Sequence, residues 1–334
     1  MLFSMDLVRL TRELIDIESV TGNEAEVGEY LYRVLSKLGY RTEKMPVEGA
    51  RHNIYAALDA RPDLVFSTHM DTVPPFMPSS EDGDKVYGRG SCDAKGIIAA
   101  QIAAAERLRG STSRIGLLFL VGEERDSQGA KEANRHTPGC RFLINGEPTE
   151  NKIGRASKGT LRVQLTATGR MAHSAYPHLG ESAIDKLVKA LHNLLEMPLP
   201  NNPEIGPATF NIGQIEGGRA PNVIPDFARA QLLYRLVGPT EKLRQGIQRA
   251  VEGLANPEFA LEIPYMKLRT VDGIPEMIAA FTTDIPALTN WGEPVLLGPG
   301  SIHVAHTDGE FIPKRELNEA VELYAFVARK LIAS

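Results

Sequence analysis

The sequence predicts an α/β protein with a largely parallel sheet, interrupted by a second domain of α+β type. Short apolar runs alternate with helical patterns, and runs of this kind form strands buried on both faces of a sheet. These runs cover residues 64–66, 115–121, 142–144 and 295–297. From Thr160 the pattern changes, because Leu161, Val163 and Leu165 alternate with polar residues, as in a strand with one face in water.

Two helical patterns belong to the first part of the chain. Apolar residues recur on one stripe from Val27 to Leu38, and Gly39 is placed to end that helix. A second helix, rich in Ala, is expected from Gly96 to Leu108, between two of the apolar runs. Alternation of strand and helix is typical of a parallel α/β sheet.

The inserted part has its own order of elements. We expect a strand from Thr160, a helix over 183–194, strands over 208–212 and 227–234, a helix over 241–254 and a strand over 259–263. Two β-α-β units on an antiparallel sheet, a ferredoxin-like arrangement, fit this order. After Val271 the α/β character returns and ends in a helix over 317–332. The predicted domains are therefore 1–155 with 272–334, and an inserted domain of 156–271.

Composition narrows the function. With 334 residues, 43% apolar and 24% charged, the chain suits a globular protein of two domains. A net charge of −5 without runs of Lys and Arg argues against a nucleic-acid partner. Neither a signal peptide nor an apolar stretch of about 20 residues is visible, so we expect a cytoplasmic protein without a membrane partner. Cys92 and Cys140 have no paired spacing, so any metal ion must use nitrogen and oxygen ligands.

Acidic residues and histidines follow the predicted strands, where ligands bind in open α/β sheets. Loops at these strand ends, together with the start of the Ala-rich helix, should converge on one rim carrying His69, Asp71, Asp93, Glu123, Glu124, Glu147 and His306. So many carboxylates would repel each other unless cations neutralise them. Two divalent metal ions meet that need, and imidazole with carboxylate suits zinc, cobalt or manganese.

Spacing within two of the motifs suggests separate tasks. His69 and Asp71 stand two residues apart, so in an extended segment they share a face and the carboxylate can orient the imidazole. Glu123 and Glu124 are adjacent and should point in different directions. One of the two can bind a metal ion while the other acts as a base.

The motifs themselves are specific. They read Ser-Thr-His69-Met-Asp71, Gly-Arg-Gly-Ser-Cys-Asp93-Ala-Lys-Gly, Gly-Glu123-Glu124, Gly-Glu147-Pro-Thr and Ala-His306-Thr. In this order they resemble a metallopeptidase family that includes acetylornithine deacetylase, succinyl-diaminopimelate desuccinylase, aminoacylase and carboxypeptidase G. The resemblance covers nearly the whole chain. It implies a phosphorylase/hydrolase-like, three-layer catalytic domain that binds the metal ions, and an inserted lid or dimerisation domain.

The resemblance also implies a role for each motif residue. Asp93 bridges the two ions, His69 and Glu147 complete one site, and Glu124 and His306 complete the other. Glu123 is the general base, which takes a proton from the attacking water and passes it to the leaving amine. His303 competes with His306 for the last ligand position, and the Ala-His-Thr match favours His306.

Further positions correspond to residues that contact the substrate. The segment around His173 resembles the one whose histidine stabilises the oxyanion from the partner subunit of a homodimer. Asn222 and Arg235 match substrate-contacting positions, and a guanidinium can grip an α-carboxylate with two hydrogen bonds. Gly298 and Ser301 match the loop that also receives that carboxylate.

These observations predict hydrolysis of the amide bond of an N-acyl amino acid. N-acetylornithine or N-acetylcitrulline is the leading substrate, which would place the enzyme in arginine biosynthesis. The alternatives are a desuccinylase, a deacylase of carrier-linked lysine or ornithine, and a dipeptidase. A metal-binding relative without catalysis is the alternative from another class, and the retention of Glu123 and of every expected ligand argues against it.

Overall fold

The computed structural model describes residues 6–111 and 114–333. By their internal contacts the residues separate into two compact units. Unit 1 comprises Met1–Arg155, Lys267–Met277 and Thr283–Ser334, and unit 2 comprises Ala156–Met266 and Ile278–Thr282. Unit 2 is therefore an insertion in the sequence of unit 1, and the short segment 278–282 returns to it after the main crossover.

Unit 1 is built on a mixed sheet. Its order is β1-β2-β6-β3-β7-β19-β8-β17, with β18 paired to β8. The central strands β6, β3, β7 and β19 run parallel to their neighbours in this group, and the outer pairs β1–β2, β2–β6 and β19–β8 are antiparallel. The strands are β1 (Arg41–Glu48), β2 (Arg51–Ala57), β3 (Leu64–His69), β6 (Ile115–Leu120), β7 (Phe142–Asn145), β8 (Ile153–Ser157), β17 (Met266–Lys267), β18 (Glu276–Ala279) and β19 (Glu293–Leu296).

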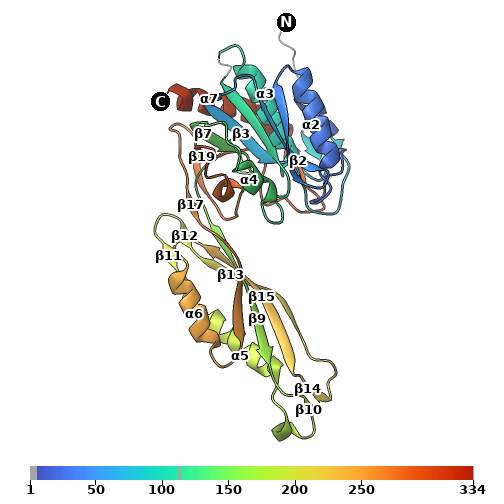
Figure 1. The fold of residues 1–334 in the computed structure, drawn as a ribbon, viewed down its shortest axis with the longest axis vertical. Coiled ribbons are helices and arrows are strands. Elements are labelled where there is room, and N and C mark those ends of the chain that lie inside the picture. The colour runs from blue at the N-terminus through green and yellow to red at the C-terminus, as the bar shows by residue number, and fades with distance from the viewer. Residues whose placement is uncertain (1–5, 112–113, 334) are drawn as a thin grey trace. The chain divides into compact units, whose positions relative to one another are not determined.

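Helices cover both faces of this sheet (Figure 1). Phe66, Leu117 and Phe119 belong to the core cluster on the side of α1, α2, α3 and α7, whereas Leu118 and Leu120 pack with α4 and with the segment after the short helix η2. Successive residues of β6 thus enter two different cores, because strand side chains alternate between faces. The helices are α1 (Leu7–Ile15), α2 (Ala25–Lys37), α3 (Lys95–Leu108), α4 (Gln128–Ala133), η2 (Ile285–Ala287) and α7 (Lys314–Ala333).

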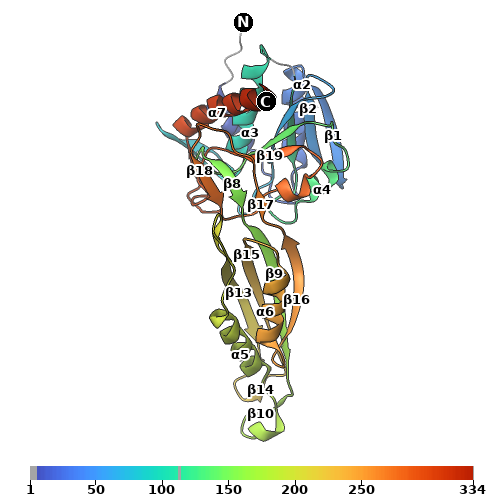
Figure 2. The same ribbon diagram turned by 90° about the vertical axis from the view of Figure 1, so that its left-hand side faces the viewer.

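Unit 2 contains an antiparallel sheet of order β13-β15-β9-β16, with α5 and α6 packed on it (Figure 2). Its main elements are β9 (Gly159–Thr168), α5 (Ala183–Glu196), β13 (Thr209–Gly217), β15 (Phe227–Leu236), α6 (Glu241–Val251) and β16 (Asn256–Ile263). This is the predicted order of two β-α-β units. Together with the three layers of unit 1, it confirms the predicted fold class.

Smaller elements complete the chain. Unit 1 carries a short sheet of β20 (Phe311–Pro313), β5 (Lys85–Tyr87) and β4 (Ser80–Glu81). Unit 2 carries two further ladders and one turn of 3-10 helix. These are β10 (Ala172–His173) with β14 (Val223–Ile224), β11 (Asn201–Asn202) with β12 (Gly206–Pro207), and η1 (Pro177–Leu179).

Most predicted elements agree with the structure, with differences at their ends. α2 ends at Lys37, and Gly39 follows with φ of +84°, a conformation that glycine adopts without strain. α6 ends at Val251 rather than at residue 254, because Glu252 has ψ of 130°, outside the helical region, and Gly253 has φ of +70°. The helix α1 was not predicted, although the Asp6 side chain caps it by accepting from Arg9 N. Among the described residues no helix is long and apolar enough to cross a membrane.

Candidate metal and catalytic centre

The parallel strands bring the predicted ligands to one edge of the unit 1 sheet. His69 is the last residue of β3, and the neighbouring strands β6 and β7 end at Leu120 and Asn145, just before the loops that carry Glu123 and Glu147. Because β3 pairs with both β6 and β7 in parallel, their carboxyl ends meet at the same edge.

Asp93 lies at the centre of the group. One carboxylate oxygen, Oδ1, is 3.0 Å from His69 Nε2, and the other, Oδ2, is 3.3 Å from His306 Nε2. His306 Nε2 is also 2.9 Å from Glu124 Oε1. His69, Asp93 and Glu124 each offer a ligand atom, and these atoms lie within 4.8 Å of one another. Each oxygen of Asp93 thus faces a different imidazole, which is the arrangement that a bridging carboxylate needs.

His306 adopts an unusual backbone conformation. Its φ is +63°, in a region that residues other than glycine rarely occupy. Such conformations persist where the surrounding structure requires them and gather at functional sites. The structure brings His306 beside Asp93 and Glu124 and leaves the side chain of His303 exposed in the same loop. Of the two candidates for the last position, His306 is therefore the one in the group.

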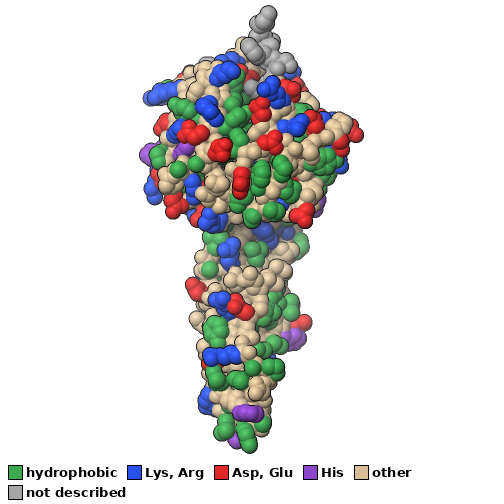
Figure 3. Space-filling view, turned by 90° about the vertical axis from the view of Figure 1, so that its right-hand side faces the viewer, with side chains coloured by type: hydrophobic (Ala, Val, Ile, Leu, Met, Phe, Trp, Pro, Cys, Tyr) green, Lys and Arg blue, Asp and Glu red, His purple; other side chains and the backbone are tan. Residues whose placement is uncertain are grey.

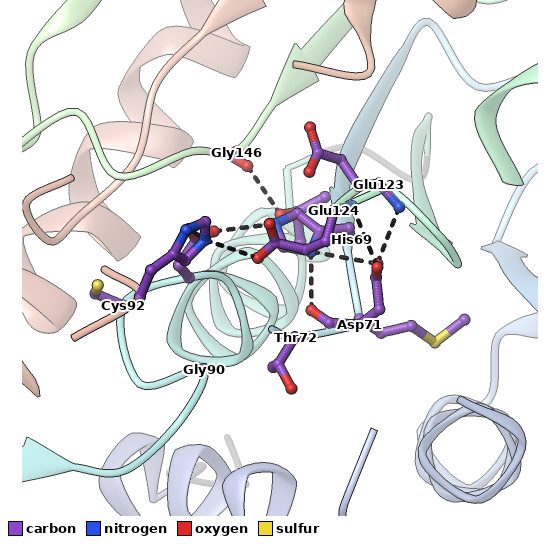
Figure 4. Close-up of polar contacts among 12 residues, drawn as sticks. His69, Asp71, Thr72, Gly90, Cys92, Glu123, Glu124 and Gly146 are labelled. Atoms are coloured by element: carbon purple, nitrogen blue, oxygen red, sulfur yellow. Dashed lines mark hydrogen bonds and ion pairs between the residues drawn. The ribbon is translucent and has the colours of Figure 1, made fainter. Parts of the chain in front are cut away.

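Asp71 connects the segments that carry the other residues (Figure 4). Its buried carboxylate accepts hydrogen bonds from the backbone N–H groups of Glu123 and Glu124, at 3.1 and 3.2 Å. It also lies 3.5 Å from His69 Nδ1, which is 3.0 Å from the carbonyl oxygen of Asp71. Both contacts lie on the ring nitrogen opposite the one that faces Asp93, so Asp71 is placed to fix the orientation of the His69 ring.

Glu123 and Glu124 point in different directions, as their adjacency suggested. Glu124 contacts His306, whereas in Figure 4 the carboxylate of Glu123 makes no dashed contact with any residue drawn. Burial, followed by the charge of Glu147, raises the pKa of Glu123 well above its usual range. A partly buried carboxylate without a bound partner is chemically suited to exchange a proton.

Glu147 is buried and its Oε1 atom has no hydrogen-bond partner among the described residues. Burial raises the pKa of Glu147 well above the usual value, and the charges of Asp93 and Glu124 raise it further, while that of His69 lowers it. A buried oxygen that is unsatisfied costs free energy unless it binds something. Glu147 therefore has the environment of a ligand whose partner is a cation.

Electrostatics of the whole group support the binding of divalent cations. Burial raises the pKa of Glu124, as it does for Glu123 and Glu147. Hydrogen bonds to Asp93 and Glu124 raise the pKa of His306 to about 10. Without cations, these groups therefore bind protons more tightly than usual, and the protons reduce the repulsion between the carboxylates. Ligands of one tetrahedral ion lie ~3.4 Å apart, close to the spacings around Asp93, so these nitrogen and oxygen ligands fit two divalent metal ions.

Glu310 received no role in the sequence analysis, and the structure shows what it does. Its buried carboxylate accepts from the backbone N–H groups of Gly90, Cys92 and Asp93, at 2.9, 3.2 and 3.2 Å, and from Arg89 at 2.7 Å. These bonds fix the loop that presents Asp93. No local signal could identify them, because more than 200 residues separate Glu310 from this loop.

Asp284 is a second residue that the sequence analysis missed. It is buried, and within the described parts of the chain neither of its carboxylate oxygens has a hydrogen-bond partner. Burial raises its pKa to about 7. Its charge acts on Glu123 and Glu147, so it belongs to the electrostatic surroundings of the centre. Asp284 stands in none of the motifs, and the apolar run 277–281 before it was not among the predicted strands, so the sequence analysis did not select it.

Gly298 and Ser301 lie in unit 1, in the loop after β19. A Cβ atom at Gly298 would be 2.4 Å from the carbonyl oxygen of Glu147, so glycine is required for this close approach. The hydroxyl of Ser301 donates to Glu150 at 2.8 Å. Gly298 thus shapes the loop that holds Glu147, and Ser301 is already engaged by a carboxylate in this structure.

The remaining predicted residues lie in unit 2 and separate into two places. His173 pairs with Val223 in the β10–β14 ladder, and Ser174 N donates to Asn222 O at 3.0 Å, so His173 and Asn222 are neighbours. Arg235 lies near the far end of β15, where its guanidinium donates to Thr160 Oγ1 at 2.9 Å. The intervening length of β15 alone spans roughly 27 Å. His173 and Arg235 of one copy therefore cannot contact one small molecule together.

We predict that removal of metal makes the stability of the protein depend on pH. The carboxyl groups of Glu123, Glu124 and Glu147 have raised pKa values in the folded protein, and so has His306. Between about pH 5 and pH 9 the folded state then binds more protons than the unfolded chain, so stability falls as pH rises through this range.

Thermal unfolding of chelator-treated and metal-loaded protein across this pH range measures the effect. The metal-loaded protein should lose less, because bound cations keep the carboxylates ionised without a penalty. An unfolding temperature of the metal-free protein that stays constant or rises between pH 5 and 9 would contradict this explanation.

Comparison with known proteins agrees with these features. Residues 155–260 match the family model described as a peptidase dimerisation domain. The chain is 37% identical to a peptidase M20 domain-containing protein of Schizosaccharomyces pombe, over 96% of this chain and 83% of that protein. It is also 37% identical to a probable carboxypeptidase of Aspergillus terreus, over 96% and 84%.

Solved structures show the same fold at lower identity. The aminopeptidase PepT of Bacillus cereus superimposes with a TM-score of 0.82 at 23% identity, and the match covers 98% of both chains. A Bacillus subtilis protein described as a dinuclear metal-binding peptidase of the M20 family matches with a TM-score of 0.69 at 17% identity, over 98% and 97% of the chains. With full-length similarity of this extent, the chain belongs to the M20 peptidase family and is a hydrolase that acts on amide or peptide bonds.

Proposed function

We propose that this protein hydrolyses the amide bond on the amino side of an amino acid whose α-carboxylate is free, with the help of two divalent metal ions. The observation that carries the proposal is the central Asp93, with one carboxylate oxygen toward His69 and the other toward His306 and its partner Glu124. The family resemblance assigns Glu147 to the ion of His69, and its buried Oε1, which lacks a partner among the described residues, supports a role as a ligand. Zinc is the leading metal, and cobalt or manganese suits the same ligands.

Each residue then has a defined task in the reaction. The two ions, when bound, supply Lewis acidity that polarises the amide carbonyl and acidifies water. Glu123 accepts a proton from the water as it attacks the carbonyl carbon, and it delivers that proton to the nitrogen as the carbon–nitrogen bond breaks. Asp71 holds His69 and the backbone of Glu123 and Glu124 in place through the contacts described above.

The environment of Arg235 supports recognition of a carboxylate. Its guanidinium is half-buried, burial lowers its pKa, and no acidic side chain lies within ion-pair distance among the residues that the structure describes. A buried cation without an anion is costly, and a substrate carboxylate would supply the missing partner through two parallel hydrogen bonds.

Two substrate groups share this requirement. The N-acyl amino acids that the motifs favour, N-acetylornithine and N-acetylcitrulline foremost, have an amide nitrogen next to a free α-carboxylate. The last residue of a peptide has the same arrangement, and the relative from Aspergillus terreus is called a probable carboxypeptidase. A desuccinylase, a deacylase of carrier-linked lysine or ornithine, and a dipeptidase fall within the same chemistry.

In a homodimer formed through unit 2, His173 of one copy and Arg235 of the other could contact the same substrate molecule. Exposed apolar residues support such an interface: Ile184 and Val188 on α5 are 37% and 59% exposed, and Ile215 on the edge strand β13 is 61% exposed. The end of unit 2 that carries β10 and β14 also exposes hydrophobic and His side chains (Figure 3). We propose that His173 and Asn222 act on the site of the partner copy, with His173 as a donor to the developing oxyanion.

The first prediction concerns the base and the substrate. Metal-loaded enzyme is assayed with N-acetylornithine, N-acetylcitrulline, N-succinyl-diaminopimelate and a dipeptide, and we expect hydrolysis of at least one. Glu123→Gln should lower kcat by about 10²- to 10⁴-fold and still bind two metal ions. The control is Glu132→Gln, which removes a surface ion pair with Arg135. Unchanged turnover in Glu123→Gln would remove Glu123 from the role of base.

The second prediction concerns the carboxylate. Arg235→Gln should raise KM for a substrate with a free carboxylate about 10- to 100-fold. It should change KM little for the matching substrate capped as a carboxamide. Arg229→Gln lies on the same strand, loses only an exposed ion pair with Glu216, and should leave both KM values unchanged. Equal losses for the free and the capped substrate would argue against this role of Arg235.

The third prediction tests the contribution of the partner copy. His173→Ala and Glu123→Ala dimers should each be inactive, and a mixture refolded together should recover about a quarter of the wild-type activity. Half of the mixed population is heterodimer, and one of its two sites combines an intact Glu123 with an intact His173. A mixture that stays inactive, although heterodimers are present by mass measurement, would show that His173 acts within its own chain, and an active His173→Ala dimer would show that it takes no part.

A further inference from the structure

The N-terminal segment 19–24 is bound along the loop that carries Asp71. The hydroxyl of Ser19 donates to Met70 O at 2.7 Å, Thr72 N donates to Ser19 O at 3.0 Å, and Thr21 N donates to Thr72 O at 3.1 Å. Val20 and Thr72 form a parallel β-bridge. This pairing places the side chain of Thr21 next to that of Asp71.

The hydroxyl of Thr21 donates to Asp71 Oδ2 at 2.8 Å. This is the shortest of the contacts to that carboxylate, since the N–H groups of Glu123 and Glu124 lie at 3.1 and 3.2 Å and His69 Nδ1 at 3.5 Å. Asp71 is fully buried, and it is not one of the residues that we propose as metal ligands. The hydroxyl is therefore one of three hydrogen-bond donors that fix the rotation of the Asp71 carboxylate, and it is the only side chain among the three.

Buried charges anchor the segment on its far side. The carboxylate of Glu24 accepts from Gly22 N at 3.0 Å and forms a two-point ion pair with Arg51, at 2.7 and 2.8 Å. Arg51 also donates to Gln128, at the start of α4, at 2.9 Å. A buried two-point pair of this kind fixes geometry more strictly than a surface pair does. Thr21 thus approaches Asp71 from a firmly held backbone.

We propose that Thr21 is a positioning residue of the catalytic centre, which acts on His69 and on the Glu123–Glu124 backbone through Asp71. Without the hydroxyl, the Asp71 carboxylate keeps only its two backbone donors, and the imidazole and the two N–H groups face a less firmly oriented acceptor. Partners one step behind a metal ligand commonly change metal affinity or activity by about 10- to 100-fold. The inference rests on the roles proposed above for His69 and Glu123.

The test compares two substitutions at one position. Thr21→Val keeps the shape and removes the hydroxyl, whereas Thr21→Ser keeps the hydroxyl and removes the methyl group. The control is Thr11→Val, because Thr11 is buried and its hydroxyl donates to a carbonyl, Leu7 O at 2.8 Å, within α1. For each full-length variant, kcat and KM are measured with the best substrate, and Co²⁺ binding is measured by calorimetry.

We expect Thr21→Val to lower kcat about 10-fold with KM within about twofold, and to weaken Co²⁺ binding about 10-fold. Thr21→Ser should restore most of both, and Thr11→Val should lower the unfolding temperature without either effect. Wild-type kcat and Co²⁺ affinity in Thr21→Val would overturn the proposal, and so would equal losses in Thr21→Ser or in Thr11→Val. If wild-type protein hydrolyses none of the substrates, the proposed substrate class fails, and the Co²⁺ affinities still decide the role of Thr21.

Discussion

Crowding of buried carboxylates at one edge of a parallel sheet is the constraint on which the rest of this structure depends. Asp93, Glu124 and Glu147 lie close enough to affect the protonation of one another, and Asp93 faces two imidazoles at once. Such a group is costly in a protein interior unless cations or protons neutralise it. The same cost favours the binding of divalent cations, because they can neutralise several of these carboxylates at once.

A crowded site must also be held rigidly, and the structure supplies a second group of buried polar residues for this purpose. Glu310 accepts the backbone N–H groups of the Asp93 loop, Asp71 accepts those of the Glu123–Glu124 loop, and Arg51 with Glu24 anchors the segment beside Asp71. Most of these contacts join loops to loops. Since loops lack the repeating hydrogen bonds of helices and sheets, their geometry depends on such side-chain acceptors.

In unit 2 the length of the strands determines where the candidate functional residues lie. His173 and Asn222 lie at one end of its sheet and Arg235 at the other, because β15 runs the whole length between them. An antiparallel sheet cannot bring its two ends together, so a site that uses both must draw on two copies of the chain. The exposed apolar residues of α5 and β13 give that association a physical basis.

The sequence by itself determined the fold class, the order of elements in both units and the strand ends where the candidate ligands lie. Apolar runs such as 115–121 specify a strand buried on both faces, and Glu123 and Glu124 directly after it specify the rim. The sequence did not predict the roles of four further buried or partly buried residues near the centre, which are Thr21, Arg51, Asp284 and Glu310. The partners of Thr21, Arg51 and Glu310 lie up to 221 residues away in the sequence, and no periodicity encodes such a pairing. Local pattern determines which element a residue joins and which face it occupies, whereas only the packing of distant loops decides which donor meets which carboxylate.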